Sequence, residues 1–319
     1  MTSTSTHAGR TAPAIEVVGL RKRYGSHAAV DGLDLRVEHG ETVAILGPNG
    51  AGKTTTVEML EGFRRPDAGT VRVLGADPAH AGRQWRDRIG VVLQDSRDQS
   101  ELTVREMVRH FAGYYSAPRD PDEVVEAVGL AAKAGARARS LSSGQRRRLD
   151  VALGIVGSPE LLFLDEPTTG FDPEARRSFW ELVRSLRGDG TTVVLTTHYL
   201  DEAAALADRV VVVTAGRVAA EGTPTSLGGS EARRPVVHWT QDGAARSERT
   251  ARPTALVARL AASLAPDDGE VPGLRIETPT LEDVYLDLVA AGRSADQPST
   301  DAPGRHPQAH DRTTTETAR

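Results

Sequence analysis

The stretch Gly47-Pro48-Asn49-Gly50-Ala51-Gly52-Lys53-Thr54 decides the fold, because it stands where an apolar strand turns into a helix. Val43 to Leu46 form a continuous apolar run before it, which is typical of a strand buried on both faces, and Thr54 to Leu60 have a helical pattern. Glycines let several backbone N–H groups point at one anion, and the helix N-terminus adds a partial positive charge. The stretch therefore predicts a phosphate-binding loop of the Walker A type.

The side chains of this loop indicate which cofactors it binds. Lys53 is expected to reach the β- and γ-phosphates of ATP, and the hydroxyl of Thr54 to bind Mg²⁺. Thr55 follows directly and is predicted to line the same site. ATP and Mg²⁺ are accordingly the expected cofactors.

Two acids and a histidine follow other apolar runs. Leu161 to Leu164 end in Asp165 and Glu166, and His198 follows a run that ends at Thr197. Open α/β sheets bind ligands at the carboxyl ends of their strands. We predict that Asp165 holds Mg²⁺, that Glu166 polarises the attacking water, and that His198 hydrogen-bonds the γ-phosphate. The simpler alternatives are solvated loop acids and a capping or surface histidine.

Composition limits the class of protein. The chain has 319 residues, 39% hydrophobic and 26% charged, which suffices for one large domain plus a smaller one. A net charge of −5 gives no indication of nucleic-acid binding, and the absence of cysteine excludes disulfides and thiolate sites. Apolar runs such as Val210–Val213 are far shorter than the ~20 residues that span a bilayer, and Met1–Ala14 lacks the apolar core of a signal peptide. We expect a soluble protein that reaches a membrane only through a partner.

Strands alternating with helices predict an α/β fold: a P-loop NTPase core with a mixed, mainly parallel sheet, an antiparallel β subdomain, an inserted helical lobe and a small C-terminal α+β region. The expected organisation is a disordered leader at 1–13, an ATPase domain at 14–228 with the lobe at about 95–157, a small domain at 229–292 and a disordered tail at 293–319.

A second loop identifies a family. Leu141-Ser142-Ser143-Gly144-Gln145 lies between the phosphate loop and Asp165, and resembles the LSGGQ signature loop of ABC-type ATPases. Further motifs resemble that family in the same order: the aromatic residue that stacks on adenine, the Q-loop glutamine after the strand Ile89–Leu93, the D-loop and the switch histidine, matched here by Tyr24, Gln94, Thr169-Gly170-Phe171-Asp172 and His198. The resemblance covers about residues 14–228.

The resemblance implies a head-to-tail homodimer with two ATP molecules at its interface. Ser142 to Gln145 of one subunit would close on the ATP held by the other, with Asp172 at the same interface. Gln94 would sense Mg²⁺ and the attacking water. Two departures stand out. Ser143 replaces the first signature glycine and either crowds the γ-phosphate or adds a donor, and Phe171 replaces the usual leucine as a bulkier apolar group at the dimer interface.

Two further stretches, Glu101–Glu106 and Pro279–Leu286, resemble the daunorubicin-resistance-type exporter subfamily. This implies efflux of a drug, antibiotic or lipid through a separate integral-membrane ABC-2-type permease at the cytoplasmic face of the membrane. The capped helix Leu281–Leu288 is expected to be structural or to stabilise the dimer. The substrate stays open, because its contacts should lie in the permease.

A non-transport ABC ATPase, such as a translation or DNA-repair factor, is the alternative; the single ATPase domain and the charge of −5 argue against it. A P-loop kinase or GTPase would give the signature loop no role.

Overall fold

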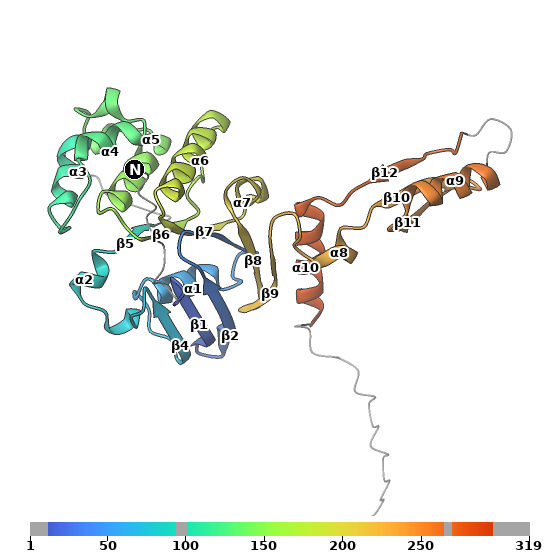
Figure 1. The fold of residues 1–319 in the computed structure, drawn as a ribbon, viewed down its shortest axis with the longest axis horizontal. Helices are drawn as coiled ribbons and strands as arrows, with labels where there is room; N and C mark the ends of the chain where they lie inside the picture. Colours follow the sequence, from blue (N-terminus) through green and yellow to red (C-terminus); the bar gives the residue numbers. More distant parts are fainter. Residues whose placement is uncertain (1–11, 94–100, 265–269, 296–319) are drawn as a thin grey trace, which may run out of the picture.

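The computed structural model describes residues 12–93, 101–264 and 270–295 (Figure 1). Its centre is a six-stranded sheet in the order β5-β6-β7-β3-β8-β9. The strands are β5 (Ile89–Val92), β6 (Leu161–Asp165), β7 (Thr192–Thr197), β3 (Thr42–Leu46), β8 (Arg209–Thr214) and β9 (Arg217–Gly222). The first five pair in parallel and β9 pairs antiparallel with β8, as a hairpin. The predicted mixed, mainly parallel sheet is confirmed.

This sheet separates two hydrophobic cores. Alternate residues of β3 and β6 enter opposite cores: Ala44 and Leu164 pack with the helical side, whereas Ile45 and Phe163 pack with the side of the antiparallel sheet. All five residues of each of these two strands are buried. Burial on both faces explains why the sequence shows continuous apolar runs there.

The second core lies under a three-stranded antiparallel sheet in the order β2-β1-β4, which confirms the predicted β subdomain. Its strands are β1 (Ile15–Tyr24), β2 (His27–Val37) and β4 (Ala68–Val73), and α1 (Lys53–Leu60) packs beside it. The pairing of β1 is irregular near its middle. The register shifts between Val17 and Leu20, at Gly19 with φ of 61°, so a β-bulge interrupts the alternation.

Helices occupy the other face of the main sheet (Figure 1). The lobe contains α3 (Val104–Ala112), α4 (Pro121–Ala127) and α5 (Ser143–Ile155), with 3-10 turns at Ala131–Lys133 and Ala138–Ser140. α6 (Pro173–Gly188) follows β6, and α7 (Leu200–Leu206) follows β7. A 3-10 turn (Pro78–His80) and α2 (Arg83–Arg86) precede β5. The sequence correctly predicted a helical insertion here.

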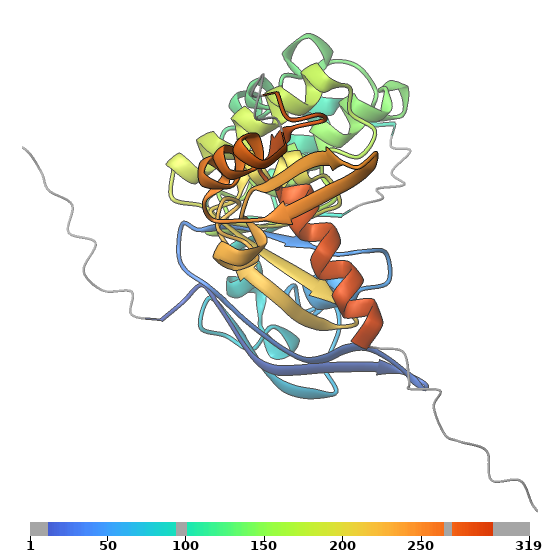
Figure 2. The ribbon, with the colours of Figure 1, turned by 90° about the vertical axis from the view of Figure 1, so that its right-hand side faces the viewer.

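The C-terminal part divides by its packing. α8 (Gly229–Ala232) leads to a small antiparallel sheet of β11 (Ala244–Arg249), β10 (Val236–Gln241) and β12 (Arg275–Glu277), covered by α9 (Pro253–Leu264). This unit has its own small core. The last helix, α10 (Leu281–Ala295), instead contributes Val284 to the main core, and both views place it beside β8 and β9 (Figures 1 and 2).

No helix within the described part of the chain is long and apolar enough to cross a membrane.

One close approach fixes the helical lobe to the main sheet. A Cβ added to Gly90 of β5 would lie 2.1 Å from the carbonyl oxygen of Gly154 in α5, and one on Gly154 would lie 2.6 Å from Cγ2 of Val92. Both contacted atoms lie in the packed interior, and the backbone carbonyl of Gly154 cannot rotate away from the added methyl group. The orientation of α5, which begins at the signature loop, therefore depends on two small residues.

We predict that Gly90→Ala lowers the free energy of unfolding by about 1–3 kcal/mol, because the new methyl group overpacks the contact with α5. Gly188→Ala is the matched control: nothing lies within 4 Å of its added Cβ, so its free energy of unfolding should be unchanged or slightly higher. Urea unfolding of both variants measures this. Equal stability of Gly90→Ala and wild type would contradict the role given to this contact.

Candidate active site

The ends of three parallel strands bring the predicted site segments to one edge of the sheet. Leu46 of β3 pairs with Thr197 of β7, and Asp165 of β6 pairs with Thr196. The residues that follow Leu46 and Thr197 are Gly47 and His198, so the phosphate loop and the switch histidine start at the same level. Ladder register, rather than distance in sequence, thus assembles the site.

The phosphate loop is packed tightly against two neighbouring strands. A Cβ on Gly47 would lie 2.3 Å from the carbonyl oxygen of Val213, and one on Gly52 would lie 2.2 Å from that of Ala29. Gly52 also has φ of 99° and caps the N-terminus of α1. Glycine is therefore required at both positions by sterics, and at Gly52 by backbone conformation as well.

Lys53 is buried at the base of the loop, where its ammonium donates to the carbonyl oxygens of Gly47 at 2.7 Å and Pro48 at 3.2 Å. Burial lowers the pKa of Lys53, and the carboxylates of Glu166 and Asp165 oppose that shift. The ammonium thus lies in the combined field of two acids, at the place where a phosphate is expected.

Asp165 lies deeper, at the end of β6, and its carboxylate accepts from the hydroxyl of Thr196. Burial raises the pKa of Asp165, and the carboxylate of Glu166 adds to that rise; the Thr196 hydroxyl, Arg147 and Lys53 oppose it. A buried acid of this kind gains from a nearby cation. Its oxygen, together with the Thr54 hydroxyl, belongs to the donor class that Mg²⁺ prefers, so these residues fit the predicted ion.

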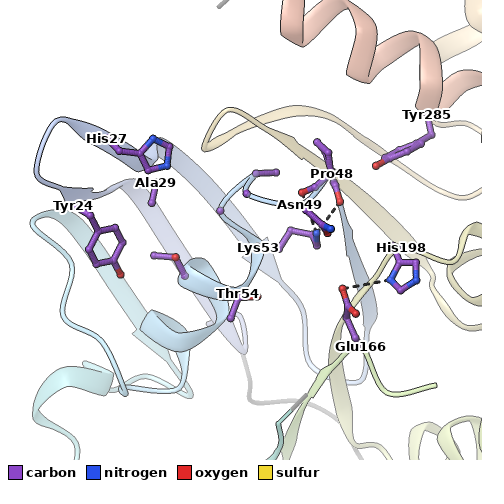
Figure 3. Close-up of a pocket in the computed structure, with 15 residues that line it drawn as sticks. Tyr24, His27, Ala29, Pro48, Asn49, Lys53, Thr54, Glu166, His198 and Tyr285 are labelled. Carbon is purple, nitrogen blue, oxygen red and sulfur yellow. Dashed lines mark hydrogen bonds and ion pairs between the residues drawn. The ribbon is translucent and has the colours of Figure 1, made fainter. Parts of the chain in front are cut away.

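Glu166 and His198 face one another. The Nδ1 atom of His198 lies 3.4 Å from a carboxylate oxygen of Glu166, and the two side chains are 43% and 14% exposed (Figure 3). Glu166 has φ of 45°, a conformation that few non-glycine residues adopt, and its N–H donates to both oxygens of Thr196 at 3.1 Å. These bonds hold the backbone in a tight turn, so the carboxylate projects into the cavity.

The cavity has a volume of about 790 Å³ and gathers most of the predicted residues. Glu166, His198, Tyr24 and the whole of Gly47–Thr55 line it (Figure 3). Tyr24 is 43% exposed at one side, and its ring lies 5.5 Å from the Arg64 guanidinium and 5.9 Å from the Lys22 ammonium. The result is a nucleotide-sized pocket lined by one exposed aromatic ring, a buried lysine and the acid Glu166, whereas Asp165 lies deeper and does not line it.

The signature loop is separate from this cavity. Ser142 caps α5 and forms a capping box with Gln145, with backbone-to-side-chain distances of 3.1 and 3.3 Å. Ser143 and Gly144 form the first turn of that helix. None of these four residues lines the pocket. The structure thus brings the phosphate loop, Glu166 and His198 together, but leaves the signature residues elsewhere on the same chain.

The D-loop residues Phe171 and Asp172 lie at the start of α6. The carboxylate of Asp172 caps α6, where it accepts from the N–H of Ala175 at 2.8 Å, and it does not line the pocket. The expectation that Phe171 is an interface residue is wrong: it is 7% exposed and packs edge-to-face on Phe179, 6.0 Å between centroids. The motif fixes its place in the sequence, whereas the buried neighbours of α6 decide where the ring points. Gln94 lies outside the described residues.

Sequence reasoning missed three side chains near the site. Arg147, one turn after the signature loop, is buried and donates to the backbone oxygens of Pro167, Leu93 and Asp165. Glu61 follows α1, and burial, with Asp165 and Glu58 nearby, raises its pKa to about 8. Tyr285 of α10 lines the cavity. Arg147 lies close to the signature loop in the sequence, but no local pattern indicated which backbone oxygens its guanidinium would contact.

The fold and the cavity together define a P-loop ATPase. Comparison with known proteins then gives the family. The family model of the ABC transporter domain matches residues 30–169. Three relatives share much of the chain.

The daunorubicin resistance ATP-binding protein DrrA3 of Streptomyces coeruleorubidus is 49% identical over 67% of this chain and 69% of its own length. The daunorubicin/doxorubicin resistance ATP-binding protein DrrA of Streptomyces peucetius is 42% identical over 90% and 95%. The Nod factor export ATP-binding protein I of Ralstonia nicotianae is 46% identical over 67% and 68%. Among solved structures, a dimeric bacterial ABC transporter cassette superposes with a TM-score of 0.59 at 25% identity, covering 66% of this chain and 98% of that one.

The chain belongs to the ATP-binding proteins of ABC transporters, in the subfamily of the daunorubicin resistance ATPases. It is an ATPase.

The partly buried acid Glu61 makes stability depend on pH. Its folded-state pKa, about 8, exceeds its ordinary value of 4.5. Its contribution to stability is therefore complete below pH 4.5 and is lost as pH rises through 8.

We predict that Glu61→Gln matches wild type at pH 4 and is more stable at pH 9, by up to about 3 kcal/mol. Urea unfolding in EDTA, without nucleotide, measures this. Glu126→Gln, at an exposed position, should follow wild type throughout. If Glu61→Gln and wild type show the same pH dependence, the acid is not held protonated by its surroundings.

Proposed function

We propose that this chain is the ATP-hydrolysing subunit of an exporter, which works as a head-to-tail dimer on a separate ABC-2-type permease. The observation that carries the proposal is the half-site: one cavity holds the phosphate loop, Glu166 and His198, while Ser142 to Gln145 lie outside it on the same chain.

Hydrolysis follows from the groups in the cavity. The backbone N–H groups of the phosphate loop and Lys53 bind the phosphates and stabilise the negative charge that grows on the γ-phosphoryl group. Glu166 orients the attacking water and accepts its proton, and His198 donates to a γ-phosphate oxygen while its other ring nitrogen faces Glu166. Mg²⁺, held by Thr54 and Asp165 together with Gln94, would supply positive charge to the phosphates.

The second half of the site comes from a second copy of the chain. The N-terminus of α5, with Ser142 and Gln145 in its cap, is an anion-binding end of a helix. A partner subunit would place this end against the γ-phosphate, and Tyr24 would stack on adenine. The dimeric state of the related cassette supports this arrangement. Ser143 begins α5 and is exposed, so its hydroxyl would face the nucleotide of the partner.

Export is supported by the relatives. Two are named for resistance to daunorubicin and one for export of Nod factor. A drug, an antibiotic or a lipid is accordingly the substrate class proposed here, with the substrate contacts in the permease. The chain would act at the cytoplasmic face of the membrane through that partner.

We predict that Glu166→Gln reduces ATP turnover at least 10²-fold, because the water loses its general base while the ligand shell remains. The affinity for ATP should stay near that of wild type. Steady-state phosphate release and equilibrium binding measure the two. Glu174→Gln, an exposed acid in the first turn of α6, is the control and should hydrolyse ATP normally. Phosphate release near the wild-type rate from Glu166→Gln would rule out the role given to this carboxylate.

Transport itself is tested by co-expression with the membrane protein of the neighbouring gene. Co-purification, ATPase stimulation by daunorubicin-like compounds, and loss of efflux in the Glu166→Gln variant are expected. Binding to ribosomes or DNA instead of that membrane protein would favour the non-transport alternative.

A further inference from the structure

The C-terminal helix α10 reaches the nucleotide cavity. Tyr285 lines the cavity together with the phosphate loop, Glu166 and His198. Figure 3 shows it across the cavity from Tyr24, with its hydroxyl pointing toward Pro48 and Asn49. A tyrosine from a segment about 120 residues beyond Glu166 thus stands beside the groups expected to bind phosphate.

The position of Tyr285 is fixed by its neighbours. Val284 is 1% exposed in the main core, and α10 packs on α7, β8 and β9. Gly228 makes room for it, since a Cβ there would lie 2.5 Å from Cγ1 of Val284. At the start of the helix, Thr280 and Asp283 exchange three hydrogen bonds of 2.8, 2.8 and 3.2 Å. The ring is therefore held by a buried anchor and a capped helix end.

The same helix contacts the small C-terminal sheet. Asp287 lies 3.5 Å from the guanidinium of Arg249 in β11, and Arg233, before β10, donates to the carbonyl oxygen of Pro279 at 3.4 Å. Val284 thus contacts the main core, Tyr285 lines the cavity, and Asp287 contacts the C-terminal sheet. One rigid helix joins all three.

We propose that Tyr285 is a nucleotide-binding residue of this chain, whose phenolic hydroxyl donates to a phosphate oxygen of bound ATP. α10 then belongs to the ATP site and is stabilised further by bound nucleotide, and the C-terminal sheet receives that signal through Asp287. The inference rests on the proposed ATPase function and adds a residue, and a route of regulation, from outside the ATPase motifs.

A structural alternative gives Tyr285 a packing role only, since its ring is partly buried against the main core. Tyr285→Phe separates the two roles, because it keeps the ring and removes the hydroxyl. Leu286→Ala is the matched control: Leu286 is the next residue of α10, is 55% exposed and does not line the cavity.

Two measurements on the full-length Glu166→Gln chain test the proposal. Equilibrium binding of radiolabelled ATP should weaken about tenfold in Tyr285→Phe, the size expected for one lost hydrogen bond to a charged group, and change less than twofold in Leu286→Ala. Hydrogen exchange should slow in both α1 and α10 when ATP is added.

The outcomes are distinct. Unchanged affinity in Tyr285→Phe, or ATP slowing exchange in α1 but not in α10, overturns the inference and leaves the proposed function standing. No slowing in α1 would mean that the phosphate loop does not take ATP, and would overturn both.

Discussion

The register of three parallel strands is the constraint on which the site depends. β3, β7 and β6 are paired so that Leu46 lies opposite Thr197, and Thr196 opposite Asp165. Each of these strands therefore ends at the same edge of the sheet, where the phosphate loop, His198 and Glu166 follow. A slip of one residue would move each side chain of a strand from one core to the other, so packing on both sides of the sheet also fixes the geometry of the site.

The signature helix α5 is also tied to this edge of the sheet. Arg147 of α5 donates to backbone oxygens of Asp165, Pro167 and Leu93, so the signature helix is bound to the end of β6 and to the residue before Gln94. The contact of Gly90 with Gly154 fixes the same helix against β5. The start of α5 is thus held in place against the strand end that carries Asp165 and Glu166.

Much of this could be predicted from the sequence, for a physical reason. Strands buried on both faces are continuous apolar runs, and a phosphate loop needs glycines at fixed spacing, so both are local signals. Asp165, Glu166 and His198 were found because they directly follow such strands. Arg147, Glu61 and Tyr285 were not, because their roles depend on partners far away in sequence. Phe171 was misplaced because a motif gives a position but not the direction of a side chain.

The central claim is that ATP is held between two copies of the chain. Its most direct measurement is the mass of the Glu166→Gln chain by light scattering, with and without ATP and Mg²⁺. The account predicts a monomer that becomes a dimer on ATP, and no dimer when Ser142→Arg is added, although that variant still binds ATP through its own phosphate loop. A mass that does not respond to ATP, or a dimer that Ser142→Arg leaves intact, would contradict it.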